Sequence, residues 1–143
     1  MQLTTHTDYA LRLLIHLASK REDEPATVQD VAARYGISAH HVAKVAQTLG
    51  QLGYVHSQRG RGGGLELALA PDSIRLGEVV RQTENLKILE CFGPDSTCPI
   101  EPACRLKGIL DDALQSFLAV LDRYVLADLV TNRDELRGLL VRR

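Results

Sequence analysis

Two short amphipathic segments separated by a glycine most constrain the fold of this 143-residue chain. The first, "TVQDVAARYG", opens with Thr27 and carries Asp30 three positions later, the arrangement of an N-terminal capping box. It ends at Gly36, whose missing Cβ suits the left-handed turn that closes a helix. The second, "SAHHVAKVAQTLGQLG", is capped by Ser38 and has Val42 on its apolar side. Helix, glycine-containing turn and helix predict a helix-turn-helix.

The residues after the second helix make this prediction more specific. "YVHSQ" and "LELAL" are typical of two short strands, joined by the loop "RGRGGG". The glycines let the loop tip approach a backbone closely, and Arg59 and Arg61 supply charge suited to a phosphate or a narrow minor groove. A winged helix is therefore expected. A hairpin that only turns the chain is the alternative; a nucleotide-binding loop is disfavoured because no Lys-Ser/Thr follows.

The distribution of charge favours DNA as a partner. The net charge is only −1, yet no Asp or Glu occurs from Val31 through Leu65. A local basic face on a neutral protein indicates a nucleic-acid footprint, with a solvated surface that lacks acids as the alternative. The residues expected to bind DNA are Ser38, His40, His41, Lys44, Gln47, Arg59, Arg61 and Gly62.

The remaining periodicity predicts further helices. One begins near Thr5 or Thr7 and stops before "KREDEP", and a packing helix begins at about Leu76. A helix of about seven turns is expected over 106–131. Its apolar positions include Leu106, Leu110, Ala113, Phe117, Val120, Tyr124 and Ala127. So wide an apolar face favours a second copy of the helix, hence a twofold homodimer with two DNA-reading heads; the alternative is that the helix folds back on its own domain.

All three cysteines lie in "CFGPDSTCPIEPACRL", spaced C-x₆-C-x₅-C. Thiols stay reduced in the cytoplasm, so a metal site or a redox sensor is favoured over a structural disulfide. Gaps of six and five residues are too wide for a zinc knuckle and suit a loop around a larger object. An iron–sulfur cluster is expected, with zinc or a bare thiol switch as alternatives. Such clusters normally take four protein ligands, and Asp95 and Glu101 are the carboxylates within the loop.

These motifs predict a mainly α fold with a small β-hairpin, divided into four parts. Residues 1–84 form a winged helix-turn-helix DNA-binding domain, 85–105 a cluster-binding loop, 106–131 a dimerisation helix and 132–143 a C-terminal segment. No apolar run reaches the roughly 20 residues that span a bilayer, and the N-terminus lacks signal-peptide features, so a cytoplasmic protein without membrane contact is expected. A redox enzyme or electron carrier is disfavoured, because no nucleophile-base pairing occurs and an electron carrier needs no winged helix.

In combination, the winged helix, the "RGRGGG" wing, the three-cysteine loop and the long helix resemble the NsrR/IscR family of bacterial winged-helix iron–sulfur transcription regulators. The resemblance covers nearly the whole chain and implies a homodimeric repressor of a palindromic operator in double-stranded DNA. Where the cluster-assembly branch has a His three residues after the last cysteine, this chain has Lys107. The nitric-oxide-sensing branch has an Asp near the N-terminus, matched here by Asp8.

The resemblance therefore implies a nitric oxide sensor whose cluster is held by Cys91, Cys98, Cys104 and Asp8. A 4Fe-4S cluster is favoured, with 2Fe-2S as the alternative, and sensing of cluster status or oxidants is the alternative function. Arg12, one turn after Asp8, is expected to steady the carboxylate or the cluster. A plain surface Asp–Arg pair is the alternative reading of these two residues.

Overall fold

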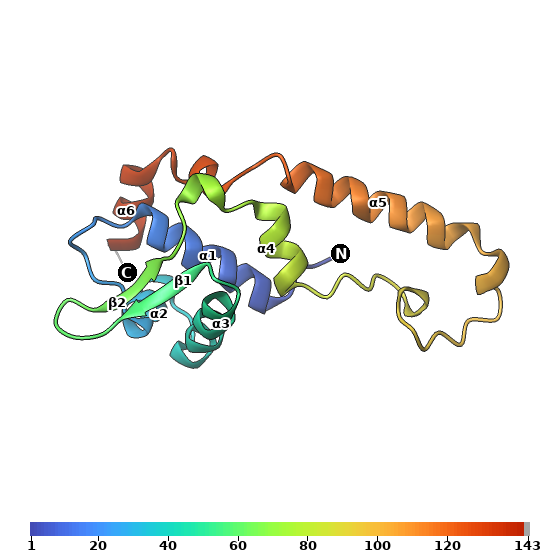
Figure 1. Ribbon diagram of the computed structural model, residues 1–143, viewed down its shortest axis with the longest axis horizontal. Coiled ribbons are helices and arrows are strands. Elements are labelled where there is room, and N and C mark those ends of the chain that lie inside the picture. The colour runs from blue at the N-terminus through green and yellow to red at the C-terminus, as the bar shows by residue number, and fades with distance from the viewer. Residues whose placement is uncertain (142–143) are drawn as a thin grey trace.

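Six helices and one two-stranded antiparallel sheet build the part of the chain that this computed structural model describes, residues 1–141. The helices are α1 (Thr5–Ser19), α2 (Val28–Tyr35), α3 (Ala39–Gln51), α4 (Leu76–Thr83), α5 (Arg105–Leu121) and α6 (Arg133–Val141), and the strands are β1 (Val55–Gln58) and β2 (Gly64–Leu67). Figure 1 shows α1 to α4, the sheet and α6 gathered into one head, from which α5 projects. The predicted mainly α fold with a small hairpin is confirmed. In residues 1–141 no helix is both long and apolar enough to cross a membrane.

Local capping chemistry fixes the helix-turn-helix. The Asp30 N–H donates to Thr27 Oγ1 (3.1 Å) and the Thr27 N–H donates to Asp30 Oδ2 (3.0 Å), which completes the predicted capping box. The hydrogen bonds from the Thr27 side chain and then its backbone hold the pKa of Asp30 below its ordinary value. Gly36 closes α2 with φ 64°, as predicted. Ser38 is the N-cap residue of α3, as predicted, but its exposed side chain makes no cap hydrogen bond.

The core of the head is centred on α1. Leu13 and Leu14 of α1 are at most 1% exposed and pack in one cluster with Val42 and Leu49 of α3. Burying each such leucine contributes about 1.5–3 kcal/mol before cavity and strain effects. The wing joins this core through Leu65, whose N–H donates to the Ala26 carbonyl (2.7 Å). The reading helices and the wing are therefore fixed to the same helix.

Two glycines allow the wing to lie close to the rest of the head. In the hairpin, Val55 pairs with Leu67 and Gln58 pairs with Gly64. A Cβ at Gly64 would lie 2.8 Å from the Ala26 carbonyl oxygen, and a Cβ at Gly63 would collide with the carbonyl of Gln58. Only glycine fits at either position without a backbone shift.

The long helix ends earlier than the sequence predicts. The helix expected over 106–131 stops at Leu121, and the chain then turns back to the head. There the Leu126 N–H donates to the Ile74 carbonyl (2.8 Å), and Leu126 and Val130 are 0% and 3% exposed. Tyr124 and Ala127 therefore do not continue the α5 stripe.

The physical reason for the early end is that this segment buries more apolar surface against the head than it would as a free helix. The Arg81 guanidinium also donates two hydrogen bonds to the Asp122 carboxylate (2.5 and 2.8 Å), which fixes the turn beside α4. The alternative, folding back on the same domain, applies to this last part. The predicted segment 132–143 contains α6, and its residues 142–143 lie outside the described part.

Candidate functional site

The second helix of the helix-turn-helix presents an exposed polar face. Val42, Val45 and Leu49 fix α3 in the core, each at most 2% exposed. The opposite face holds the predicted DNA-binding residues Ser38, His40, His41, Lys44 and Gln47, all exposed. A helix that is anchored on one side and polar on the other can enter a major groove.

The wing carries the other predicted DNA-binding residues. Arg59, Arg61 and Gly62 are exposed in the loop between β1 and β2, and no ion pair within residues 1–141 occupies either guanidinium. Gly60 and Gly62 have φ of 103° and 73°, so the tight tip depends on residues without a Cβ. The loop can thus hold the guanidinium groups of Arg59 and Arg61 close to a DNA backbone.

Replacing Arg61 with Ala is expected to weaken DNA binding by about 10-fold on operator and random DNA alike, because a lost phosphate contact is not sequence-specific. The slope of log affinity against log salt concentration should flatten by about one. Fluorescence anisotropy across a salt series measures both quantities. Arg123→Ala is the matched control, since Arg123 is exposed on the turn after α5. An unchanged affinity and slope would remove the wing from the DNA-binding surface.

Asp8 lies in the first turn of α1 and is held by Arg12, as the sequence predicts. Arg12 Nε and Nη2 each lie 2.9 Å from one oxygen of the Asp8 carboxylate. The same guanidinium lies 5.6 Å from the ring centre of Tyr9 and 6.0 Å from that of Tyr35, within range of cation–π attraction. The Tyr9 ring is in turn 6.0 Å from the ring of His41 on α3. Asp8 is therefore linked through Arg12 to both helices of the helix-turn-helix.

Tyr35 strengthens this link from α2. Its hydroxyl donates a hydrogen bond to the Arg12 carbonyl (3.2 Å). Burial raises the pKa of Tyr35, so the phenol remains a donor at neutral pH. This hydrogen bond joins the backbone of α1 at Arg12 to the end of α2.

Glu84 ties the start of the cysteine loop to the start of α1. Its Oε2 accepts hydrogen bonds from the Thr4 N–H (2.8 Å) and the Thr4 hydroxyl (3.1 Å), one turn before Asp8. Burial raises the pKa of Glu84, but the hydrogen bonds from Thr4 and its neighbours outweigh it and lower that pKa overall. A carboxylate at the positive end of α1 is also stabilised by the helix dipole.

The three cysteines lie on the extended segment between α4 and α5. Cys91, Cys98 and Cys104 are free thiols, and each is half-buried. Figure 1 shows this segment leading away from the head before it turns into α5. Within residues 1–141 no three His, Cys, Asp or Glu side chains converge on a metal-binding point, so in the described chain the three cysteines form no ligand cluster, either by themselves or with Asp8.

The chemistry of these side chains nevertheless fits a soft metal centre. Thiolates are the ligands that iron–sulfur clusters take from proteins. Cys104 is the residue from which α5 starts, so it lies at the positive end of a 17-residue helix, which favours a negatively charged ligand. The pKa of Lys107 is raised, chiefly by its hydrogen bond to Glu101 and to a smaller extent by Cys91 nearby.

The competing carboxylates of the loop are placed differently. Glu101 Oε1 accepts a hydrogen bond from Lys107 Nζ (2.6 Å), which holds the pKa of Glu101 below and that of Lys107 above their ordinary values. Asp95 is exposed. Close to it in the sequence, the Thr97 N–H and hydroxyl donate hydrogen bonds to the Glu90 carboxylate (2.5 and 2.8 Å), which connects the two ends of this part of the loop. Glu101 is thus already neutralised, whereas Asp95 has no ion-pair partner in residues 1–141.

Sequence reasoning missed Tyr9, Tyr35 and Glu84 as parts of this site. In the sequence Tyr9 is only one apolar position of the first helix, because its approach to His41 is made by tertiary packing. Glu84 is separated from Thr4 by 80 positions, and no local pattern signals that contact.

Comparison with known proteins identifies the family. Residues 3–132 match the Rrf2 family model, described as an iron-dependent transcriptional regulator. The chain is 51% identical to the HTH-type transcriptional regulator NsrR of Halalkalibacterium halodurans, with 98% of this chain and 97% of that protein covered, and 49% identical to NsrR of Bacillus subtilis over 98% and 97%.

Solved structures agree. IscR of T. potens superposes with a TM-score of 0.75 at 25% identity, covering 95% of this chain and 90% of that one. CymR, the global cysteine regulator of B. subtilis, superposes with a TM-score of 0.69 at 27% identity, covering 92% and 98%. The role is regulatory and not enzymatic, and the predicted family resemblance is confirmed. This chain belongs to the Rrf2 family of transcriptional regulators.

Proposed function

We propose that this protein is a homodimeric repressor that releases a palindromic operator when nitric oxide reacts with its iron–sulfur cluster. The proposed ligands are Cys91, Cys98 and Cys104 of one protomer and Asp8 of the partner subunit. The observation that carries the proposal is the position of Asp8: its Arg12 partner contacts Tyr9 and Tyr35. The relatives named NsrR support the same function.

The dimer follows from α5. This helix contacts α4, and its buried residue is Leu118, which is 2% exposed. Leu106, Ile109 and Val120 of the same helix are 54%, 60% and 46% exposed. An apolar stripe of this length on a projecting helix is stabilised by a second copy, and a twofold pair would read two half-sites.

The partner subunit supplies Asp8 in this proposal because the segment between α4 and α5, which carries the cysteines, leads away from the head of its own chain (Figure 1). When bound, a cluster would supply the iron at which nitric oxide reacts. In the described chain both Asp8 oxygens are taken up by Arg12. If Asp8 bound the partner's cluster, one of these oxygens would bind iron and would no longer contact Arg12. Formation or loss of that bond would therefore change the ion pair between Asp8 and Arg12.

The change at Arg12 has a direct route to DNA. Its guanidinium rests on Tyr9, which contacts His41 on the reading helix, and on Tyr35 at the end of α2. The bond between Asp8 and the cluster thus shifts the positions of α2 and α3. The operator binds more tightly to the arrangement with this bond than to the arrangement without it. The coupling needs no contact between the cysteines and DNA.

The test is the absorption spectrum of anaerobically purified protein, with iron and sulfide assays and operator affinity, before and after addition of nitric oxide. Cluster absorption with bound iron and sulfide, together with a fall in operator affinity on nitric oxide, is expected. Cys98→Ala should lose stable cluster binding. Zinc alone in the purified protein would contradict the cluster, and release of DNA by oxidants but not nitric oxide would favour the alternative sensor.

Asp8→Ala is expected to keep a cluster on three cysteines while changing its spectrum. The affinity difference between untreated and nitric-oxide-treated protein should shrink, because Arg12 is then no longer controlled by the cluster. Asp95→Ala is the matched control, since Asp95 is an exposed carboxylate of the loop. The contrary outcome is that Asp8→Ala matches the parent in absorption spectrum, nitric oxide response and operator affinity while Asp95→Ala or Glu101→Ala does not. The fourth ligand would then come from the cysteine loop, and the partner's Asp8 would play no part.

A further inference from the structure

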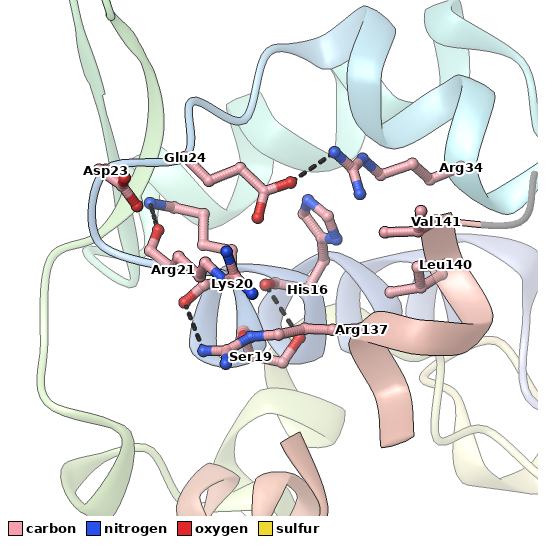
Figure 2. Close-up of a pocket in the computed structure, with 10 residues that line it drawn as sticks. All are labelled: His16, Ser19, Lys20, Arg21, Asp23, Glu24, Arg34, Arg137, Leu140 and Val141. Atoms are coloured by element: carbon pink, nitrogen blue, oxygen red, sulfur yellow. Dashed lines mark hydrogen bonds and ion pairs between the residues drawn. The ribbon is translucent and has the colours of Figure 1, made fainter. Parts of the chain in front are cut away.

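A pocket lies on the head behind the helix-turn-helix, between the end of α1, the loop after it, α2 and α6 (Figure 2). Its volume of about 420 Å³ is within the range of small-molecule sites. None of its lining residues belongs to α3, to the wing strands or to the cysteine loop. The pocket is therefore distinct from the DNA-binding surface and from the proposed cluster.

His16 is the central polar side chain of this pocket. Figure 2 shows its ring rising from α1 into the space between the Glu24–Arg34 pair and α6. The residue is 3% exposed, yet neither ring nitrogen has a hydrogen-bond partner within residues 1–141. Buried histidines normally satisfy at least one nitrogen inside the protein, so two orphaned nitrogens facing a pocket indicate a missing partner.

The protonation state of His16 defines what it can bind. Burial, followed by repulsion from Arg34, lowers the pKa of His16 to about 4. At neutral pH the ring is uncharged and offers one N–H donor and one nitrogen acceptor. A ligand in the pocket can therefore accept a hydrogen bond from the His16 N–H. It does not have to balance a positive charge on the ring, because the ring is neutral.

The charges around His16 favour an anion. Four cationic side chains line the pocket against two carboxylates, and one of the four, Arg137, is also ion-paired with Asp134 (3.2 Å), which leaves a surplus of one positive charge. Arg34 is paired with Glu24 (2.5 Å), and Arg137 donates to the Ser19 carbonyl (2.5 Å). Lys20 and Arg21, by contrast, form no ion pair within the described part of the chain.

The last residues of α6 add an apolar part to the lining. Leu140 and Val141 line the pocket together with Arg137 of the same helix, and Val141 is 72% exposed. A bare inorganic anion would leave this apolar part uncovered. A molecule with a charged end and an apolar end would satisfy both parts at once.

We propose that this pocket binds a small organic carboxylate through a hydrogen bond from His16 and attraction to Lys20, with its apolar part against Leu140 and Val141. The bound molecule would join α1 and α2 to α6. Because only the folded head presents this arrangement, binding should raise the melting temperature of the protein. The site does not involve the cysteines, so its test stands apart from that of the cluster.

Sodium benzoate is the probe, titrated into the full-length protein by calorimetry and followed by thermal unfolding. Saturable binding with a raised Tm is expected, and benzyl alcohol and inorganic phosphate should bind at least about 10-fold more weakly. His16→Phe keeps a flat ring but removes both nitrogens, and Lys20→Gln removes the charge without altering the core. Each should weaken benzoate binding by about 10-fold, whereas Arg123→Gln, outside the pocket, should not.

The proposal is overturned if millimolar benzoate gives no saturable binding, or if His16→Phe or Lys20→Gln binds benzoate as the parent does. Equal binding of phosphate would reduce the site to a cluster of surface cations, and equal binding of benzyl alcohol would remove the role of charge. If His16→Phe fails to fold, Lys20→Gln decides the outcome, because Lys20 lies at the edge of the pocket with a partly exposed side chain.

Discussion

Replacing Ile109 with Asp is expected to leave the protein monomeric and to lower its operator affinity by about 100-fold or more, since a monomer loses the second half-site. Ile109 is 60% exposed on the outer face of α5. In a twofold dimer formed by this face, each copy would bury a new carboxylate, at a cost of several kcal/mol unless the charge reaches water. Analytical ultracentrifugation gives the oligomeric state, and anisotropy at fixed salt gives the affinity.

Gln115→Asp is the matched control for this experiment, because Gln115 is exposed on α5 outside the apolar stripe. It should remain a dimer with normal affinity. An Ile109→Asp protein that sediments as the parent dimer would place the interface on another surface. Ile109 is a cleaner probe than Phe117, which is half-buried in its own protomer, so that an Asp there would also disturb the fold.

The contrast between these two residues shows what periodicity can and cannot predict. Amphipathic spacing predicts an apolar stripe on this helix because such spacing is a local property. The predicted stripe leaves out Leu118 and Ile109. Its last two positions, Tyr124 and Ala127, lie beyond the end of α5. The spacing did not divide the apolar positions between two partners. Leu118 is buried in its own chain while Ile109 is 60% exposed, and that division depends on where the helix sits relative to the head.

Local chemistry explains the parts of the fold that the sequence predicted well. The capping box at Thr27 and the left-handed turn at Gly36 involve residues a few positions apart, so composition and spacing suffice. The same holds for Asp8 and Arg12, which are one helical turn apart. These pairs form wherever the helix forms.

The parts that escaped prediction are made by distant segments. The pocket at His16 exists because α6 returns to α1, with Arg137 bonded to Ser19 across 118 positions. In the sequence His16 lies next to Ile15 and Leu17 within the apolar pattern of the first helix, and nothing local sets it apart. Its two unpartnered nitrogens appear only once the neighbours of the ring are known.

Replacing Leu126 with Ala is expected to lower the free energy of unfolding by about 2–5 kcal/mol, the range for a buried leucine that leaves a cavity. Leu126 is 0% exposed and lies in the core of the head, with its N–H bonded to the Ile74 carbonyl. Urea unfolding at one fixed protein concentration measures the effect, because dimerisation makes stability depend on concentration. The midpoint should fall while the slope of the transition stays unchanged.

Leu139→Ala is the matched control, since this leucine on α6 is 60% exposed and should shift stability by less than about 0.5 kcal/mol. The comparison separates two structures of the same segment. If 106–131 were one continuous helix, as its periodicity alone predicts, Leu126 would lie far along α5 and its truncation would disturb the dimer more than the head. If Leu126→Ala weakens the dimer and leaves the unfolding free energy of the head unchanged, the continuous long helix is the correct structure. If it destabilises the head and leaves the dimer intact, the chain turns after Leu121. The segment after that turn then completes the core on which α2 and α3 are held.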